Sequence, residues 1–175
     1  MSTLINTSTV VQDTWVTFDG DAADIPAGSD VVLPIEEWLE RTSVWRAHAG
    51  RVAVLLEPGD DPERLAATLG DLTMVVVDFP AFTDGRGFSI ARLLRSRFNF
   101  TGTVRASGQI IADQVLMLRR CGFTEFNLPG DLAAGTALRL LKIAAPTYQP
   151  DASGVRTIAL PGERPRVGAR PTLPL

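Results

Sequence analysis

The stretch TMVVVDFPAFTDGRGFSIARLLRSRF, residues 73–98, decides the predicted fold. Its first seven residues are mostly apolar and β-branched, without alternating polar side chains, which indicates a strand buried on both faces. A loop with two glycines follows, and then a segment whose apolar side chains recur with the period of a helix: Ile90, Leu93, Leu94 and Phe98. A strand that leads through a short loop into an amphipathic helix is the repeating unit of a parallel α/β sheet.

The same alternation continues on both sides of this stretch. Further strands are predicted at residues 31–34, 51–57, 101–107 and 124–128, and further helices at residues 35–45, 60–71, 109–122 and 131–145. Four or five such units are too few to close an eight-stranded barrel. The predicted fold is therefore α/β, with a mainly parallel sheet of four to five strands and helices packed on both faces. An open sheet and a partial barrel remain as alternative forms.

The predicted organisation is one α/β domain at residues 1–149 and a tail at residues 150–175. The tail is rich in Pro, Gly and Arg and has neither a helical nor a strand period, so we expect it to be flexible or to dock on a partner. Residues 14–18 are the one strand-like patch before residue 28, and the pattern there predicts no role for the N-terminal segment.

Composition excludes several classes of protein. The chain has 175 residues and a net charge of −3, which argues against a general nucleic-acid binder. No apolar run approaches the ~20 residues that span a membrane, and the first residues lack the basic start and apolar core of a secretory signal, so a cytoplasmic location is expected. With one cysteine and one histidine, the chain by itself cannot build a structural zinc site or an iron–sulfur cluster. No metal and no cofactor is therefore predicted.

Polar side chains at the strand ends are the first candidate site, because parallel α/β folds place their sites at the carboxyl ends of the strands. Glu57, Asp78 and Arg105 are predicted to emerge on one edge of the sheet. The two carboxylates could hold a divalent cation with water, or they could form salt bridges with Arg105 or Arg86. The loops that follow the strands add five candidates: Thr83, Asp84, Arg86, Ser107 and Gln109.

The sequence TDGRG, residues 83–87, is open to two interpretations. Its glycines could allow positive φ or close backbone approach, so that the following helix N-terminus and Arg86 hold an anion. Alternatively, it is a glycine turn in which Asp84 caps the loop. The spacing matches neither the dinucleotide fingerprint nor the P-loop. Cys121 is predicted to be a buried structural residue, and His48 a surface residue that takes part in no catalytic triad.

Three segments resemble an uncharacterised bacterial protein family. They are LLEPGDDPERLA, then VVVDFPAFTDGRGFSIARLLRSRFNFTGTVRASGQIIADQVLMLRRCGFTEFNL, and TYQP. The family is labelled a domain of unknown function, or an oxidoreductase involved in sulfite reduction, and the resemblance covers residues 51–149. The matched positions are Phe82, Asp84, Gly85, Arg86, Gly87, Ser89, Arg92, Arg105, Gly108, Asp113, Gln114, Arg119, Arg120, Cys121 and Gly122.

The resemblance implies a role in assimilatory sulfate reduction, because members are typically encoded beside sulfite reductase and phosphoadenylylsulfate reductase. It implies no catalytic residue, and three hypotheses stay open. In the first hypothesis, the chain is an accessory protein that binds one of these reductases or a small anion, with Arg86, Arg92 and Arg105 supplying positive charge. Alternatively, it is a small enzyme that uses Glu57, Asp78 and Asp113 as acid, base or metal ligands. The third hypothesis is a structural or regulatory subunit, and the oligomeric state is left open.

Overall fold

A computed structural model of the chain describes residues 2–20, 25–143 and 151–152. Apart from Asp151 and Ala152, the predicted tail lies outside the described residues. The backbone N–H of Ala152 donates to the carbonyl oxygen of Arg120 at 2.8 Å, so this short piece of chain lies against the end of a helix.

One seven-stranded sheet organises the described residues, with its strands in the order β1-β7-β6-β5-β4-β3-β2. The strands from β2 to β7 run parallel to their neighbours, and β1 pairs antiparallel with β7 at one edge. Their bounds are β1 (Ser2–Asn6), β2 (Val16–Thr17), β3 (Val31–Pro34), β4 (Val52–Leu56), β5 (Met74–Phe79), β6 (Thr103–Gly108) and β7 (Glu125–Pro129).

Helical segments connect the parallel strands. The α-helices are α1 (Ile35–Glu40), α2 (Thr42–Arg46), α3 (Arg86–Ser96), α4 (Val115–Cys121) and α5 (Gly130–Leu141). Three short 3₁₀ helices complete the connections: η2 (Pro62–Leu65), η3 (Leu69–Asp71) and η4 (Ala112–Gln114). The predicted helix 35–45 is broken at Arg41, and the predicted helix 60–71 is two 3₁₀ turns.

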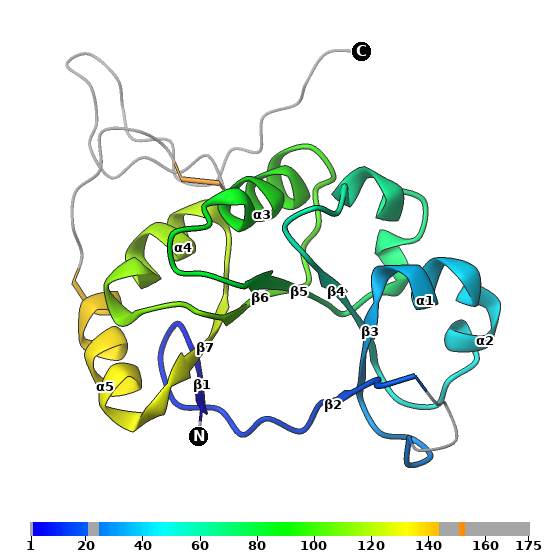
Figure 1. Cartoon of the computed structure of the whole chain (residues 1–175), viewed down its shortest axis with the longest axis horizontal. Coiled ribbons are helices and arrows are strands. Elements are labelled where there is room, and N and C mark those ends of the chain that lie inside the picture. The colour runs from blue at the N-terminus through cyan, green and yellow to red at the C-terminus, as the bar shows by residue number, and fades with distance from the viewer. Residues whose placement is uncertain (1, 21–24, 144–150, 153–175) are drawn as a thin grey trace.

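The α/β class is confirmed, but the predicted sheet was wrong in three respects. It has seven strands rather than four to five, and it is mixed because β1 is antiparallel. It also curls into a half-barrel with its helices on the outer side, so helices do not cover both faces (Figure 1). The partial barrel is thus the form observed. β1 was missed because it is a polar-rich edge strand that depends on pairing with the distant β7, whereas β2 lies within the strand-like patch predicted at residues 14–18.

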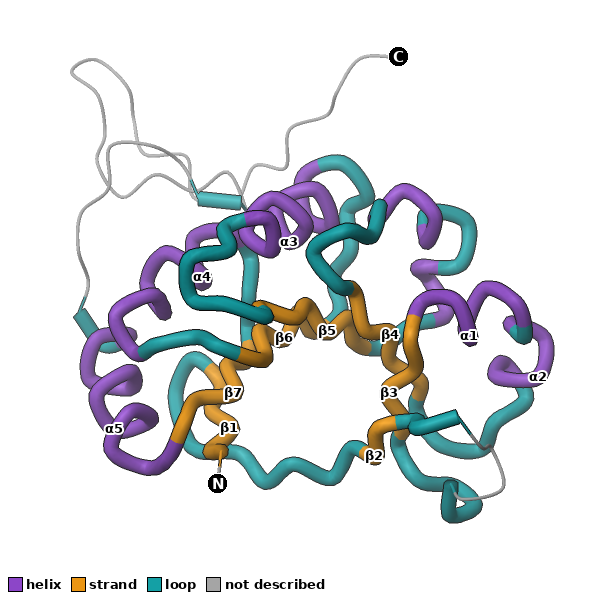
Figure 2. The backbone as a smooth tube through the Cα atoms, in the orientation of Figure 1, coloured by secondary structure: helices purple, strands orange, loops and turns teal. Residues whose placement is uncertain are grey.

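The two faces of the sheet differ in what covers them. On the outer face, alternate strand residues such as Val75, Val77 and Phe79 pack with the helices in the main hydrophobic core. The inner face carries a small apolar cluster of Val32, Ala53, Met74 and Val76, against which Trp15 and Leu55 pack. Trp15 belongs to the segment between β1 and β2, which crosses the opening of the half-barrel (Figure 2).

None of the described helices is long and apolar enough to cross a membrane. The expected cytoplasmic location stays a prediction.

Candidate functional site

Asp78 lies on the inner face of the half-barrel, one residue before the end of β5. It shares this face with Met74 and Val76 because side chains alternate along a strand. Burial raises the pKa of the Asp78 carboxyl group, and a hydrogen bond from the backbone of Phe79 acts in the opposite direction. A partly buried carboxyl group with a raised pKa at the carboxyl end of a parallel strand is a candidate functional group.

The neighbouring strand is shaped to leave room for this carboxylate. Gly108 ends β6 with a φ of +91°, and a Cβ atom there would lie 2.6 Å from Oδ1 of Asp78 and 2.4 Å from the carbonyl oxygen of Phe79. The backbone N–H of Gln109 donates to that same carbonyl at 2.6 Å, which fixes the chain where it leaves β6. A glycine is therefore required at position 108 by its positive φ and by the close approach of the Phe79 backbone, and its lack of a side chain also leaves space beside Asp78.

Two further polar side chains continue from Asp78 across the inner face. Ser107 pairs with Asp78 across β5 and β6, and Asn127 pairs with Leu4 across β7 and β1. Ala106 pairs with Phe126, so the residues that follow them, Ser107 and Asn127, lie on the same face of adjacent strands. Asp78, Ser107 and Asn127 therefore form a row at the carboxyl ends of β5, β6 and β7, which we call the inner polar row.

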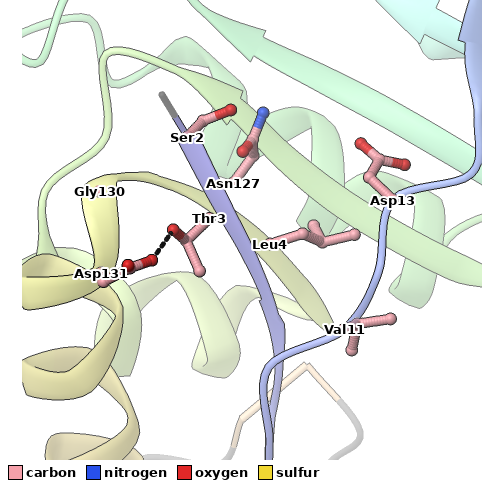
Figure 3. Close-up of a pocket in the computed structure, with 8 residues that line it drawn as sticks. All are labelled: Ser2, Thr3, Leu4, Val11, Asp13, Asn127, Gly130 and Asp131. Atoms are coloured by element: carbon pink, nitrogen blue, oxygen red, sulfur yellow. Dashed lines mark hydrogen bonds between the residues drawn. The ribbon is translucent and has the colours of Figure 1, made fainter.

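A groove of about 310 Å³ lies at the Asn127 end of this row (Figure 3). One wall is formed by β1 and β7, and the opposite wall by Val11 and Asp13 of the segment that crosses the half-barrel. At the N-terminus of α5, the carboxylate of Asp131 accepts a 2.6 Å hydrogen bond from the Thr3 hydroxyl. The residues that line the groove are Ser2, Thr3, Leu4, Val11, Asp13, Asn127, Gly130 and Asp131.

Arg105 lies under this region and is 5% exposed. Its guanidinium donates to both carboxylate oxygens of Asp13, at 3.0 and 3.1 Å, and to Glu125 at 2.9 Å. The prediction that Arg105 emerges at the sheet edge beside Glu57 and Asp78 was wrong, because β6 continues for three residues beyond it. Arg105 is instead a buried cation that two carboxylates hold, and one of them comes from a segment 92 residues away in the chain.

The TDGRG loop is a turn closed by its own ion pair. Arg86 donates to Asp84 through Nε at 3.0 Å and through Nη2 at 2.7 Å, and the pair lowers the pKa of Asp84. Neither glycine of the loop has a positive φ. Gly87 allows close approach instead, since a Cβ atom there would lie 2.6 Å from the ring of Phe79. Of the two interpretations, the loop geometry favours the turn, with Arg86 already held by a carboxylate.

The other predicted site residues do not join the inner polar row. Glu57 is exposed directly after β4, Gln109 is exposed after β6, and Asp113 is exposed in η4. Within residues 2–20, 25–143 and 151–152, no group of three or more His, Cys, Asp and Glu side chains is arranged to hold a metal ion. Of the predicted strand-end residues, Asp78 does lie at the carboxyl end of its strand, and its role in a site stays a prediction.

Arg92 belongs to a different surface, on the outer side of the helices. Arg92 and Arg120 both lie close enough to Cys121 to lower the pKa of its thiol, although burial has the larger effect and raises it. Arg119 donates to the carbonyl oxygen of Leu141 at 3.0 Å and so joins the end of α4 to the end of α5. We call the resulting set of cations on α3, α4 and the end of α5 the basic face: Arg92, Arg119, Arg120, Arg139 and Lys142.

The cations of the basic face have no carboxylate partner among the described residues. Seven other described arginines form ion pairs: Arg41, Arg46, Arg51, Arg64, Arg86, Arg97 and Arg105. Nε of Arg120 is buried without a hydrogen-bond partner. Two apolar side chains project beside these cations, Leu93 on α3 and Met117 on α4, and they are 37% and 56% exposed.

Asp13, Glu125 and Asn127 are among the residues of these sites that the sequence analysis missed. Glu125 and Asn127 alternate with the buried Phe126 and Leu128, and this alternation could have indicated that one face of β7 is polar. Nothing in the local pattern around Asp13 indicates its contact with Arg105, because that contact depends on the path of the crossing segment.

A comparison with protein families gives a match over more than half of the chain. Residues 53–159 match the model of a family described as "Bacterial protein of unknown function (DUF934)". A comparison with curated proteins found no match. The inner polar row and the whole basic face lie within the matched range. β1 and the crossing segment, which form part of the groove, lie outside it.

Proposed function

The chain belongs to the DUF934 family of bacterial proteins, and on this premise we propose that it is an accessory protein of assimilatory sulfite reduction that docks on a reductase. The observation that supports docking is the basic face, whose cations no carboxylate neutralises among the described residues. The partner in this proposal is sulfite reductase or phosphoadenylylsulfate reductase, as the family resemblance implies.

Charge is distributed very unevenly along the chain. Up to Ala91 the sequence has fifteen Asp and Glu and five Arg, whereas from Arg92 onward it has five Asp and Glu and twelve Arg and Lys. A net charge of −3 therefore conceals an acidic N-terminal half and a basic C-terminal half. Such a surface favours partners of opposite charge, because complementary potentials speed encounter and exclude wrong partners.

The basic face also has the composition of a protein-binding surface. Arginine and methionine are enriched in protein interfaces, where apolar side chains form the centre and charged groups the rim. Leu93 and Met117 beside Arg92 and Arg120 fit this arrangement. Binding of a small anion at the strand ends has less support, because Arg86 and Arg105 are both already held by carboxylates.

The test is binding of the full chain to each purified reductase, at low and at moderate salt. We expect the double substitution Arg92→Glu with Lys142→Glu to weaken binding by about tenfold or more, which corresponds to about 1.4 kcal/mol. Both side chains are exposed and have no hydrogen-bond or ion-pair partner among the described residues, so the fold should persist. The charge-matched control is Arg41→Glu with Arg64→Glu, which changes the net charge equally in the N-terminal half and breaks two ion pairs at the surface, with Glu37 and Glu36.

Cells provide the second measurement, with growth on sulfate as the sole sulfur source. The double substitution on the basic face should slow this growth, and the control substitution should not. Absence of binding to both reductases, together with normal growth after deletion of the gene, would contradict the proposed function.

A further inference from the structure

We propose that the inner polar row and the adjoining groove form a binding site for a small organic molecule that carries a primary amine. The proposal rests on the juxtaposition of Asp78, Ser107 and Asn127 with the groove between β1, β7 and the crossing segment. It does not depend on the proposed function, since the basic face lies on the opposite, helical side of the sheet (Figure 1).

The first argument is that the hydrogen-bonding capacity of the row is unused. Among the described residues, Ser107 and Asn127 have no side-chain hydrogen bond, and neither does Ser2 at the groove. Within the described ranges, Asp78 has only the backbone of Phe79 as a partner. By contrast, the carboxylates of Asp13, Glu125 and Asp131 are all engaged. Convergent polar groups without protein partners, beside a concavity, are what a ligand site provides.

The second argument is the dimension of the site. Neighbouring strands lie about 4.8 Å apart, so Asp78 and Asn127, two strands from each other, are about 10 Å apart. The groove beyond Asn127 has a volume of about 310 Å³, and ligand sites begin at about 300 Å³. Leu4 and Val11 supply apolar contact on its two walls (Figure 3). This combination suits a small molecule with a short aliphatic part.

The third argument is charge, which selects an amine. Arg105 is the cation beneath the row, and it is shared between Asp13 and Glu125, so these three groups retain one net negative charge. Asp78 and Asp131 add two carboxylates, and no Arg or Lys is among the residues that line the groove. Arg51 also acts on Glu125, but it is itself paired with Asp30. An ammonium group would be attracted and would donate to Asp78, whereas sulfate or phosphate would be repelled.

The fourth argument is that the fold makes room for Asp78 at a cost. Burial disfavours its charged form, and Gly108 is required next to it in a conformation that side chains rarely adopt. An asparagine at position 78 would avoid the burial penalty. Groups that cost stability and have no side-chain partner in the fold are typical of functional sites.

The experiment is a titration of the full, ¹⁵N-labelled protein with matched pairs of probes. One pair is 1,4-diaminobutane and 1,4-butanediol, and the other is glucosamine and glucose; sodium sulfate is the anion. We expect the amines to shift the amide signals of Ser107 and Asn127 in a saturable way. We expect the diol, glucose and sulfate to bind at least about tenfold more weakly, since they lack the ammonium group.

Asp78→Asn is the test variant, and Glu40→Gln, which removes an exposed carboxylate on α1, is the control. The first should weaken amine binding by about tenfold or more, and the second should leave it unchanged. A dispersed spectrum shows that each variant is folded, and Ser107→Ala is the substitute if Asp78→Asn is not. Equal binding of diol and diamine, unsaturable shifts, or unchanged binding by the folded variants would overturn the proposal. Reductase binding by Asp78→Asn should be unaltered, so the two proposals can fail separately.

Discussion

At the residue scale, the Asp78 carboxyl group links burial to a dependence of stability on pH. Its pKa is raised above the ordinary value of 3.8 because burial disfavours the ionised form. When the folded-state pKa of an acid is raised, the fold binds the proton more tightly than the unfolded chain does. The stabilising contribution is then complete below the unfolded value and is lost as the pH rises through the folded value.

We therefore predict that Asp78→Asn makes the protein more stable than the native chain at neutral pH. Asparagine keeps the shape of the protonated acid and never ionises, so the difference should vanish as the pH falls below 3.8. Urea unfolding across this pH range measures it, with Glu40→Gln as the control. A variant less stable than the native chain at neutral pH would show that the Asp78 carboxylate has a stabilising partner.

At the element scale, the junction between β5 and α3 depends on one of its two glycines. α3 approaches β5 so closely that Gly87 lies against the ring of Phe79, which itself packs edge-on with Phe88 at a centroid distance of 5.5 Å. Gly85 precedes the helix with a φ of −86° and has nothing within 4 Å of an added Cβ. The close approach of the helix to the strand, rather than a special backbone conformation, thus explains the second glycine of TDGRG.

We predict that Gly87→Ala destabilises the protein by about 1–3 kcal/mol, because a methyl group would overlap the Phe79 ring and force the helix outward. Gly85→Ala is the matched control and should change stability by about 0.5 kcal/mol or less, as expected for an open surface position. Thermal and urea unfolding of the two variants measure the difference. Equal effects of both substitutions would show that α3 can move away from β5 at little cost.

At the scale of the whole molecule, the N-terminal segment closes the open side of the half-barrel. It leaves β1 at one edge of the sheet, crosses the opening and joins β2 at the other edge (Figure 2). Trp15 packs on the inner apolar cluster, and the guanidinium of Arg51 lies 5.0 Å from its ring centroid. Asp13 anchors the same segment to Arg105 in the middle of the sheet. The crossing segment is therefore held to the inner face by the polar contact of Asp13 and by the apolar contact of Trp15.

We predict that Arg105→Ala destabilises the protein by about 3–5 kcal/mol, because it leaves Glu125 and Asp13 without the cation that neutralises them. Asp13→Ala should cost about 1 kcal/mol, since Asp13 is 41% exposed and Glu125 continues to neutralise Arg105. A double-mutant cycle by urea unfolding measures the coupling between the two side chains. Additive effects would show that the ion pair does not hold the crossing segment.

The sequence by itself determined the local units of this protein. Residues 73–98 predicted β5 and α3, and the apolar runs at residues 51–57 and 101–107 predicted β4 and β6, because burial and helical period leave a local signature. It also determined that Asp78 lies near the carboxyl end of a buried strand, and that charge is divided between the two halves of the chain. These properties depend on residues that are neighbours in the chain.

The tertiary structure alone decided the curl of the sheet, the antiparallel β1 and the partners of Arg105. β1 pairs with β7 across more than a hundred residues, and Asp13 meets Arg105 across 92, so no local pattern contains either contact. Whether a polar residue on a strand becomes a buried ion pair or a free hydrogen-bonding group depends on what the fold places opposite it. Arg105 forms ion pairs with two carboxylates. Ser107 lies two residues later on the same face, and its side chain has no hydrogen-bond partner among the described residues.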